Sequence, residues 1–196
     1  MPITIGQGPD HGFDEPLGLL SDCHRRVEHF LEVLVAFNRQ AAGRPLIGAE
    51  RSQLEGSLTY FATAAPKHTA DEEESLFPRL RASTDPAARV LDDVLARLEH
   101  DHDDANGHHR QVDSLIRRWI ASGSLAPADV RELGEHLAAL QAIYQSHIAV
   151  EDRELFPAAG RLLSAGQVSD IGREMAARRS LRWAPATAGV RGDRTS

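Results

Sequence analysis

Two segments of the chain carry the same arrangement of histidine, glutamate and apolar residues. Residues 68–78 and 147–157 both follow the pattern HxxxExxxLFP, so that His68 and Glu72 recur as His147 and Glu151. On a helix, side chains at positions i and i+4 lie on one face, about one turn apart. Each pair therefore directs an imidazole and a carboxylate toward one point in space. A duplicated pair of this kind suits two metal ions.

Two further histidines, His24 and His102, stand at positions where leucine would ordinarily continue an apolar helical stripe. His24 precedes His68 by 44 positions and His102 precedes His147 by 45, so the four histidines can lie at one level of a helical protein. Buried carboxylates and imidazoles are costly unless they are compensated, and metal coordination compensates them. We therefore predict a metal site with six ligands: His24, His68, Glu72, His102, His147 and Glu151.

The ligand types favour iron or manganese over structural zinc. Structural zinc prefers four closed ligands that include cysteine, whereas four imidazoles and two carboxylates suit a dinuclear iron or manganese centre. We assign two histidines to each ion and expect Glu72 and Glu151 to bridge the two ions. Such ions keep positions open for dioxygen, nitric oxide or peroxide, which are the expected small-molecule partners. The LFP ends of both segments are expected to form a dry apolar layer beside the metals.

The elements that position these ligands are expected to be helices, because apolar residues recur at three- and four-residue spacing along the whole chain. Four long helices are expected to begin near Pro16, Ala49, Pro86 and Pro127, and a shorter one covers residues 169–179. Pro66 is expected to kink the second helix, and Asp85 is the expected N-cap of the third. Long amphipathic helices with short connections predict an all-α, antiparallel up-down four-helix bundle.

Composition limits the remaining classes of function. The chain has 196 residues, enough for one domain with a buried core, and a formal net charge of -7. Residues 178–196 hold five arginines and one aspartate, so the rest is more acidic than the total, which argues against nucleic-acid binding. The composition of this basic tail predicts disorder. The single cysteine excludes an internal disulfide, and without a long apolar run we expect a cytoplasmic protein that does not bind membranes.

These motifs resemble those of the hemerythrin-like (HHE cation-binding) domain family. A lone His24, the first HxxxE segment with its LFP end, a lone His102 and the second such segment follow one another in the family's order. The resemblance covers residues 13–165 and leaves residues 166–196 as a C-terminal helix and basic tail. It implies a four-helix bundle that holds a non-haem, carboxylate-bridged di-iron centre.

One position departs from the oxygen-carrying hemerythrins, which have a fifth histidine four residues after the third-helix ligand. Asn106 stands there in this chain, so simple reversible oxygen carriage is not expected. The ligand set resembles that of iron–sulfur-repair and stress-response members, but their cysteine-bearing N-terminal segment is absent. Two functions remain open. One is binding or sensing of dioxygen, nitric oxide or redox and iron status, and the other is enzymatic removal of peroxide or nitric oxide, or iron delivery, with a redox partner protein.

Other polar residues have alternative interpretations. His100 is an alternative to His102 as a ligand, although a helix directs the two about 160° apart. Glu73 is an alternative carboxylate, but acidic neighbours indicate an exposed face. His109 is expected in a channel or behind the ligands, Tyr144 either near the open position or in the core, and Cys23 is either a redox thiol or inert packing. Three histidines off the apolar stripes are expected at the surface: His29, His108 and His136.

Overall fold

The computed structural model describes residues 10–182. This part of the chain is helical and contains no strand, which confirms the all-α class. The elements, in order, are α1 (Pro16–Ala41), α2 (Gly48–Thr63), α3 (Ala65–Asp71), the π-helix η1 (Glu72–Leu76), α4 (Phe77–Arg81), the 3-10 helix η2 (Pro86–Leu91), α5 (Asp92–Ser122), α6 (Pro127–Val150), the π-helix η3 (Glu151–Leu155), α7 (Phe156–Leu162) and α8 (Ala165–Arg178).

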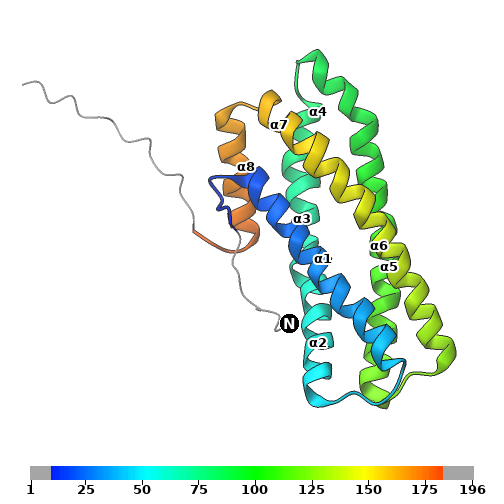
Figure 1. Ribbon diagram of the computed structural model, residues 1–196. Coiled ribbons are helices and arrows are strands. Elements are labelled where there is room, and N and C mark those ends of the chain that lie inside the picture. The colour runs from blue at the N-terminus through cyan, green and yellow to red at the C-terminus, as the bar shows by residue number, and fades with distance from the viewer. Residues whose placement is uncertain (1–9, 183–196) are drawn as a thin grey trace, which may run out of the picture.

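The long helices lie side by side around the core (Figure 1). α1 packs against α2 and α6, and α5 packs against α6 and α2, so that each of these helices has two neighbours. The short helices α3, η1 and α4 continue the line of α2, while η3 and α7 continue that of α6. α8 folds back against α1, α3 and η1. Among the described residues, every helix is too short or too polar to span a lipid bilayer.

The apolar core consists of two clusters with a polar layer between them. The first cluster contains, among others, Leu31, Leu34, Leu54, Val112, Ile116, Trp119, Leu137 and Leu140. The second contains, among others, Leu20, Leu76, Phe77, Leu95, Leu98, Leu155 and Phe156. Along α1, His24 lies between Leu20 of the second cluster and Leu31 of the first, and the same order recurs along α5. The candidate ligands thus occupy a layer closed off on both sides by apolar side chains.

Pro66 and Asp85 both lie at helix boundaries, as the sequence predicts, although Asp85 caps a different helix from the one expected. The break between α2 and α3 falls at Ala64, two residues before Pro66, because proline lacks an N–H and its ring clashes with the preceding turn. The Asp85 carboxylate accepts a hydrogen bond from the Ala87 N–H at 2.8 Å, so Asp85 is an N-cap as expected. It caps the 3-10 helix η2, which leads into α5, and not α5 itself.

A feature that the sequence does not reveal is a π-helix within each HxxxExxxLFP segment. η1 begins at Glu72 and η3 at Glu151, and the Phe77 and Phe156 N–H groups donate to the carbonyls of these two glutamates. Proline follows the phenylalanine in both segments, and a wider turn relieves its clash with the carbonyl four residues earlier. Single π turns inside α-helices occur frequently at functional sites. Here each one begins at a candidate ligand.

The C-terminal helix begins with a capping box, in which the Ser164 hydroxyl accepts from the Gln167 N–H and the Gln167 side chain accepts from the Ser164 N–H. It covers residues 165–178, close to the expected range of 169–179. The tail for which disorder is predicted lies, from residue 183 onward, outside the described residues.

Candidate metal centre

All six predicted ligands point into the polar layer. They come from α1 (His24), α3 (His68), η1 (Glu72), α5 (His102), α6 (His147) and η3 (Glu151). They form two overlapping groups, in each of which the potential ligand atoms lie within 4.8 Å of one another: His24, His68, Glu72 and Glu151, and Glu72, His102, His147 and Glu151. Each group has two histidines of its own, and both glutamates belong to both groups. This is the pattern of ligands that two neighbouring ions would share.

The shared carboxylates face histidines on both sides. Glu72 lies 3.3 Å from His68 Nε2 through one oxygen and 3.3 Å from His102 Nε2 through the other. Glu151 Oε2 lies 3.0 Å from His24 Nε2 and 3.2 Å from His147 Nε2. Every one of the four histidines therefore turns its Nε2 atom toward a shared carboxylate.

A metal ion fits this set of ligands because several of their buried polar atoms have no hydrogen-bond partner. Glu72 and Glu151 are both 0% exposed. None of their four side-chain oxygens has a hydrogen-bond partner in proper geometry, and neither has His24 Nε2, despite its 3.0 Å approach to Glu151. Buried polar atoms are nearly always paired, and an unpaired buried carboxylate is especially costly. Cations between the carboxylates and the imidazoles would satisfy these atoms together.

Three acidic residues behind the histidines fix the direction of the rings. Asp152 lies 3.0 Å from His24 Nδ1, Glu73 lies 2.7 Å from His102 Nδ1, and Asp101 lies 3.3 Å from His147 Nδ1. An acid that accepts from Nδ1–H leaves Nε2 free to bind metal and makes it more basic. Sequence reasoning missed this role. Glu73 belongs to neither group of potential ligand atoms, and it does not simply lie on an exposed face, because its carboxylate contacts His102.

The repeated segments also support the lone histidines with their phenylalanines. Phe156 stacks on His24 with ring centroids 5.5 Å apart, and Phe77 stacks on His102 at 6.4 Å. Phe77 is fully buried and Phe156 is 5% exposed. The expected dry layer beside the site is therefore present. Each segment supplies one acid and one aromatic ring to a histidine of another helix.

The pKa values of His24 and His102 are raised, because both imidazoles lie beside carboxylates. Burial alone would lower the pKa of His24, but the contact with Asp152 and the negative charge of Glu151 and Glu72 raise it to about 10. The pKa of His102 rises against burial in the same way, to about 9, mainly through Glu72. Burial and the neighbouring histidines hold the pKa of His68 well below 6.5. Without a metal ion, protons on His24 and His102 therefore offset part of the negative charge of the carboxylates.

The two glutamates differ in the direction of their pKa shifts. Burial and the charge of Glu151 raise the pKa of Glu72 to about 7. For Glu151, burial is outweighed by the close approach of the His147 and His24 imidazoles, which lowers its pKa. Two carboxylates so close together resist simultaneous ionisation unless cations lie between them. A metal ion bound at this site would therefore displace protons.

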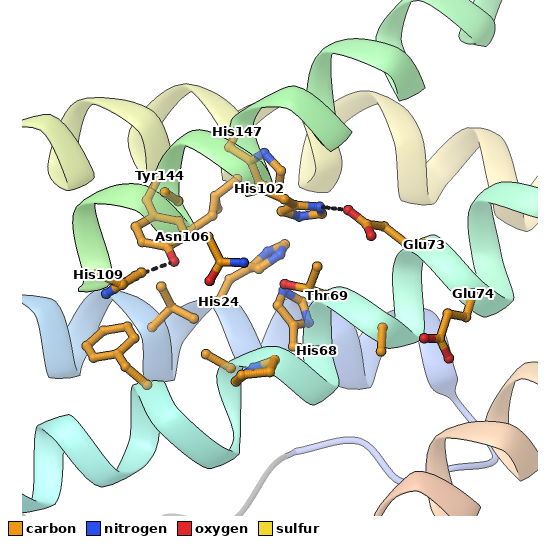
Figure 2. A pocket seen from close by; sticks show the side chains of 17 residues that line it. His24, His68, Thr69, Glu73, Glu74, His102, Asn106, His109, Tyr144 and His147 are labelled. Carbon is orange, nitrogen blue, oxygen red and sulfur yellow. Dashed lines mark hydrogen bonds and ion pairs between the residues drawn. The ribbon is translucent and has the colours of Figure 1, made fainter. Parts of the chain in front are cut away.

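A cavity of about 270 Å³ opens beside the histidines (Figure 2). All four candidate histidine ligands contribute to its wall, as does Asn106, which is exposed to solvent. His109 and Tyr144 line it too, and His109 Nε2 lies 2.8 Å from the Tyr144 hydroxyl. The remaining wall is largely apolar, with Phe61 packed against His109. The cavity gives a small molecule a route to the polar layer that contains the candidate ligands.

Several other polar residues lie away from the centre. His100 is exposed and lies 3.4 Å from Asp104, so of the two alternatives on α5 it is His102 that reaches the polar layer. His108 and His136 are not simply surface residues: both are partly buried, with their Nδ1 atoms 2.9 Å apart. His29 is also partly buried, packing edge-on against Phe30.

The single cysteine, Cys23, is buried next to His24. Burial raises the pKa of its thiol, and Arg26 donates to its sulfur at 3.0 Å. A thiol with a raised pKa is a weak nucleophile, which supports the packing interpretation over the redox one.

A helical scaffold with a buried layer of four histidines and two carboxylates defines a class of metal-binding protein. The family profile described as the hemerythrin HHE cation binding domain matches residues 15–159, and the chain belongs to this family. An uncharacterized protein of Haemophilus influenzae (strain ATCC 51907 / DSM 11121 / KW20 / Rd) is 28% identical over 172 residues, which cover 87% of this chain and 93% of that protein.

Proposed function

We propose that the chain is a non-haem di-iron protein whose residues 13–165 form an antiparallel up-down four-helix bundle of the hemerythrin type. One ion would be held by His24 and His68, and the other by His102 and His147. Glu72 and the equivalent glutamate of the second segment would bridge them. Manganese is the alternative metal, because nitrogen and oxygen ligands without thiolate suit both ions.

The observation that carries this proposal is the sharing of both buried carboxylates by two histidine pairs. A single ion would leave one pair of histidines facing an unpaired carboxylate. When bound, the two ions would supply redox chemistry and open coordination positions for a small ligand. The residues of the chain hold the ions, direct the rings through Glu73, Asp101 and Asp152, and exclude water with two apolar clusters.

We further propose that the protein binds or senses dioxygen, nitric oxide or cellular redox and iron status. The cavity beside the histidines supports a small ligand, because its volume is only about 270 Å³ and the exposed Asn106 is part of its wall. The second candidate is an enzyme that removes peroxide or nitric oxide, or delivers iron for iron–sulfur repair, together with a redox partner protein. The hydrogen-bonded His109 and Tyr144 in the same cavity favour this alternative, since proton donors assist reduction of such ligands.

Metal content tests the first part of the proposal. The full chain is expressed with added iron, and metal per chain is measured by elemental analysis together with the visible and Mössbauer spectra. We expect two iron ions per chain and a spectrum of coupled ferric ions. One zinc ion per chain, or no metal, would contradict the proposal.

Exposure to air tests whether the centre carries oxygen. The iron-loaded protein is reduced without air, exposed to air and then returned to vacuum, while its visible spectrum is followed. We expect that removing dioxygen does not restore the reduced spectrum, because Asn106 leaves an open position where oxygen carriers have a histidine. The Asn106→His variant should recover more of the reduced spectrum. Full recovery by the unchanged protein would instead identify an oxygen carrier.

A further inference from the structure

The cavity beside the polar layer has the candidate histidine ligands at one end and a second group of polar side chains at the other. His109 and Tyr144 form a hydrogen bond of 2.8 Å there, and Figure 2 shows Asn106 between this pair and the candidate ligands. Much of the wall between the two ends is apolar, including Val27 and Phe61. A ligand in the cavity therefore meets metal-binding groups at one end and a hydrogen-bonding pair at the other.

His109 is placed to pass a proton because its Nε2 atom contacts the Tyr144 hydroxyl and its side chain is only partly buried. Burial lowers its pKa to about 4, and its ring packs against Phe61 with centroids 4.3 Å apart. A neutral imidazole has one nitrogen that donates and one that accepts. When Nε2 carries the proton, it donates to the Tyr144 oxygen, and the Tyr144 hydroxyl is then free to donate into the cavity.

We propose that Tyr144 and His109 form a proton relay from solvent to a small anionic oxygen ligand, such as peroxide, bound in the cavity. This inference rests on the proposed function, since the metal ions would hold the ligand. Tyr144 gives its hydroxyl proton to the ligand, the tyrosine oxygen takes the proton from His109 Nε2, and His109 Nδ1 takes a proton from a water molecule, which leaves as hydroxide. The O–H and N–H bonds that break are matched by those that form, and no electron is transferred. Exchange with water then resets the two imidazole nitrogens.

The chain offers variants that separate a relay from a structural contact. Tyr144→Phe removes the hydroxyl and keeps the ring. His109→Gln keeps a side chain that can hydrogen-bond to Tyr144 but cannot exchange a proton between two ring nitrogens. His108→Gln is the matched control on the same helix, because His108 pairs with His136 and does not line the cavity. Tyr60→Phe is the matched control for Tyr144→Phe, because it also removes a tyrosine hydroxyl. The Tyr60 hydroxyl lies 3.5 Å from the Cys23 carbonyl.

The test uses the full, iron-loaded chain with hydrogen peroxide and with azide, a small anion that accepts hydrogen bonds. We expect Tyr144→Phe and His109→Gln to slow peroxide consumption about 100-fold and to lose the solvent isotope effect of the unchanged protein. Tyr144→Phe should also weaken azide binding, followed in the visible spectrum, about 10-fold. Both control variants should match the unchanged protein, and all four should keep two iron ions per chain.

Each outcome separates the relay from the proposed function. If the unchanged protein binds neither iron nor azide, the proposed function fails. If it binds both while Tyr144→Phe and His109→Gln react as fast as the controls, the relay is wrong and the di-iron proposal stands. If His109→Gln reacts normally and only Tyr144→Phe is slow, tyrosine acts alone and the relay through His109 is overturned. In the metal-free protein, nitrogen NMR should also show a neutral His109 whose signals shift in Tyr144→Phe.

Discussion

The two HxxxExxxLFP segments direct their ligands alike but are anchored differently. Within the first segment, Asp71 and Ser75 are buried, and Arg178 of α8 donates to them at 2.9 and 2.8 Å. Arg179 donates to the other oxygen of Asp71 at 2.7 Å. Asp71 directly precedes the shared ligand Glu72. The first half of the site is thus tied by charge to a helix outside residues 15–159, the range matched by the family profile.

The second segment has an apolar anchor at the equivalent place. Val150 takes the position of Asp71 and directly precedes the shared ligand Glu151. Its side chain packs against the apolar cluster that contains Leu155 and Phe156. The duplicated motif thus specifies the ligands, while the residue before each glutamate determines what holds them in place.

The two groups of candidate ligands also differ in the acidic residues that contact the Nδ1 atoms of their histidines. In the group of His102 and His147, both rings have an acid at Nδ1. In the group of His24 and His68, only His24 has one, because His68 Nδ1 is buried without a hydrogen-bond partner. Acids behind ligating histidines raise metal affinity. The half that contains His102 should therefore bind its ion more tightly.

The largest expected effect comes from removing one ligand of the tighter half. His102→Ala should lower the metal content from two ions per chain to one or fewer, because its group keeps only one histidine. His100→Ala, two residues away, should retain both ions, since His100 is exposed and paired with Asp104. Elemental analysis of both purified variants measures the difference. A full complement in His102→Ala with loss in His100→Ala would mean that α5 is rotated relative to this structure.

The fold class and the family could be predicted from the sequence because both rest on local patterns. Helical spacing indicates an all-α chain, and a duplicated motif with lone histidines before each copy indicates the family, which the profile match confirms. The structure also brings the six candidate ligands together, although their binding of iron stays a prediction.

The support of the ligands could not be predicted, because it depends on how the helices are rotated against one another. Glu73 lies in an acidic run that reads as a solvated face, and only the packing of η1 against α5 reveals its contact with His102. One signal was available: the residue after the shared glutamate is acidic in both segments, as Glu73 and Asp152. The π turns had only the recurring proline as a sign, and the role of Asp71 required the position of α8.

The charged anchor of the first half is tested by Asp71→Asn. This change leaves Arg178 and Arg179 without their buried carboxylate partner, so the free energy of unfolding should fall by about 3–5 kcal/mol. Glu74→Gln is the matched control, because Glu74 contacts the same Arg178 at 3.1 Å but is exposed, and should cost less than about 1 kcal/mol. Urea denaturation followed by circular dichroism measures both. Equal midpoints for Asp71→Asn and the unchanged protein would remove the contrast between the two anchors.

The difference in histidine support is tested by the acids themselves. Asp101→Ala should lower the affinity of the His102 and His147 group by about 10- to 100-fold, because His147 loses its Nδ1 partner. Asp103→Ala, a change to an exposed neighbour, should leave the affinity unchanged. Competition with a chelator, monitored in the visible spectrum, gives the affinity of each ion. If the unchanged protein loses the ion of the His102 group first, the proposed order of affinities is wrong.

The smallest expected effect concerns the outer part of the charged anchor. Arg79 of α4 donates to Glu174 of α8 at 2.7 and 3.0 Å. Burial alone would raise the pKa of the Glu174 carboxyl. Hydrogen bonds from Arg79 and Ser75 outweigh burial and lower this pKa below its usual value of 4.5. A lowered pKa in the folded state means that the stabilisation is fully present above about pH 4.5 and is lost as the pH falls through the folded-state value. Because the pair is partly exposed, Glu174→Gln should reduce the free energy of unfolding by less than about 1 kcal/mol near neutral pH. This difference from the unchanged protein should shrink as the pH falls below about 4.5. Asp170→Asn, in the exposed pair with Arg173 within α8, provides the control for charge removal elsewhere on the helix. Urea midpoints measured across this range would contradict the assignment if the effect of Glu174→Gln grew toward acid pH.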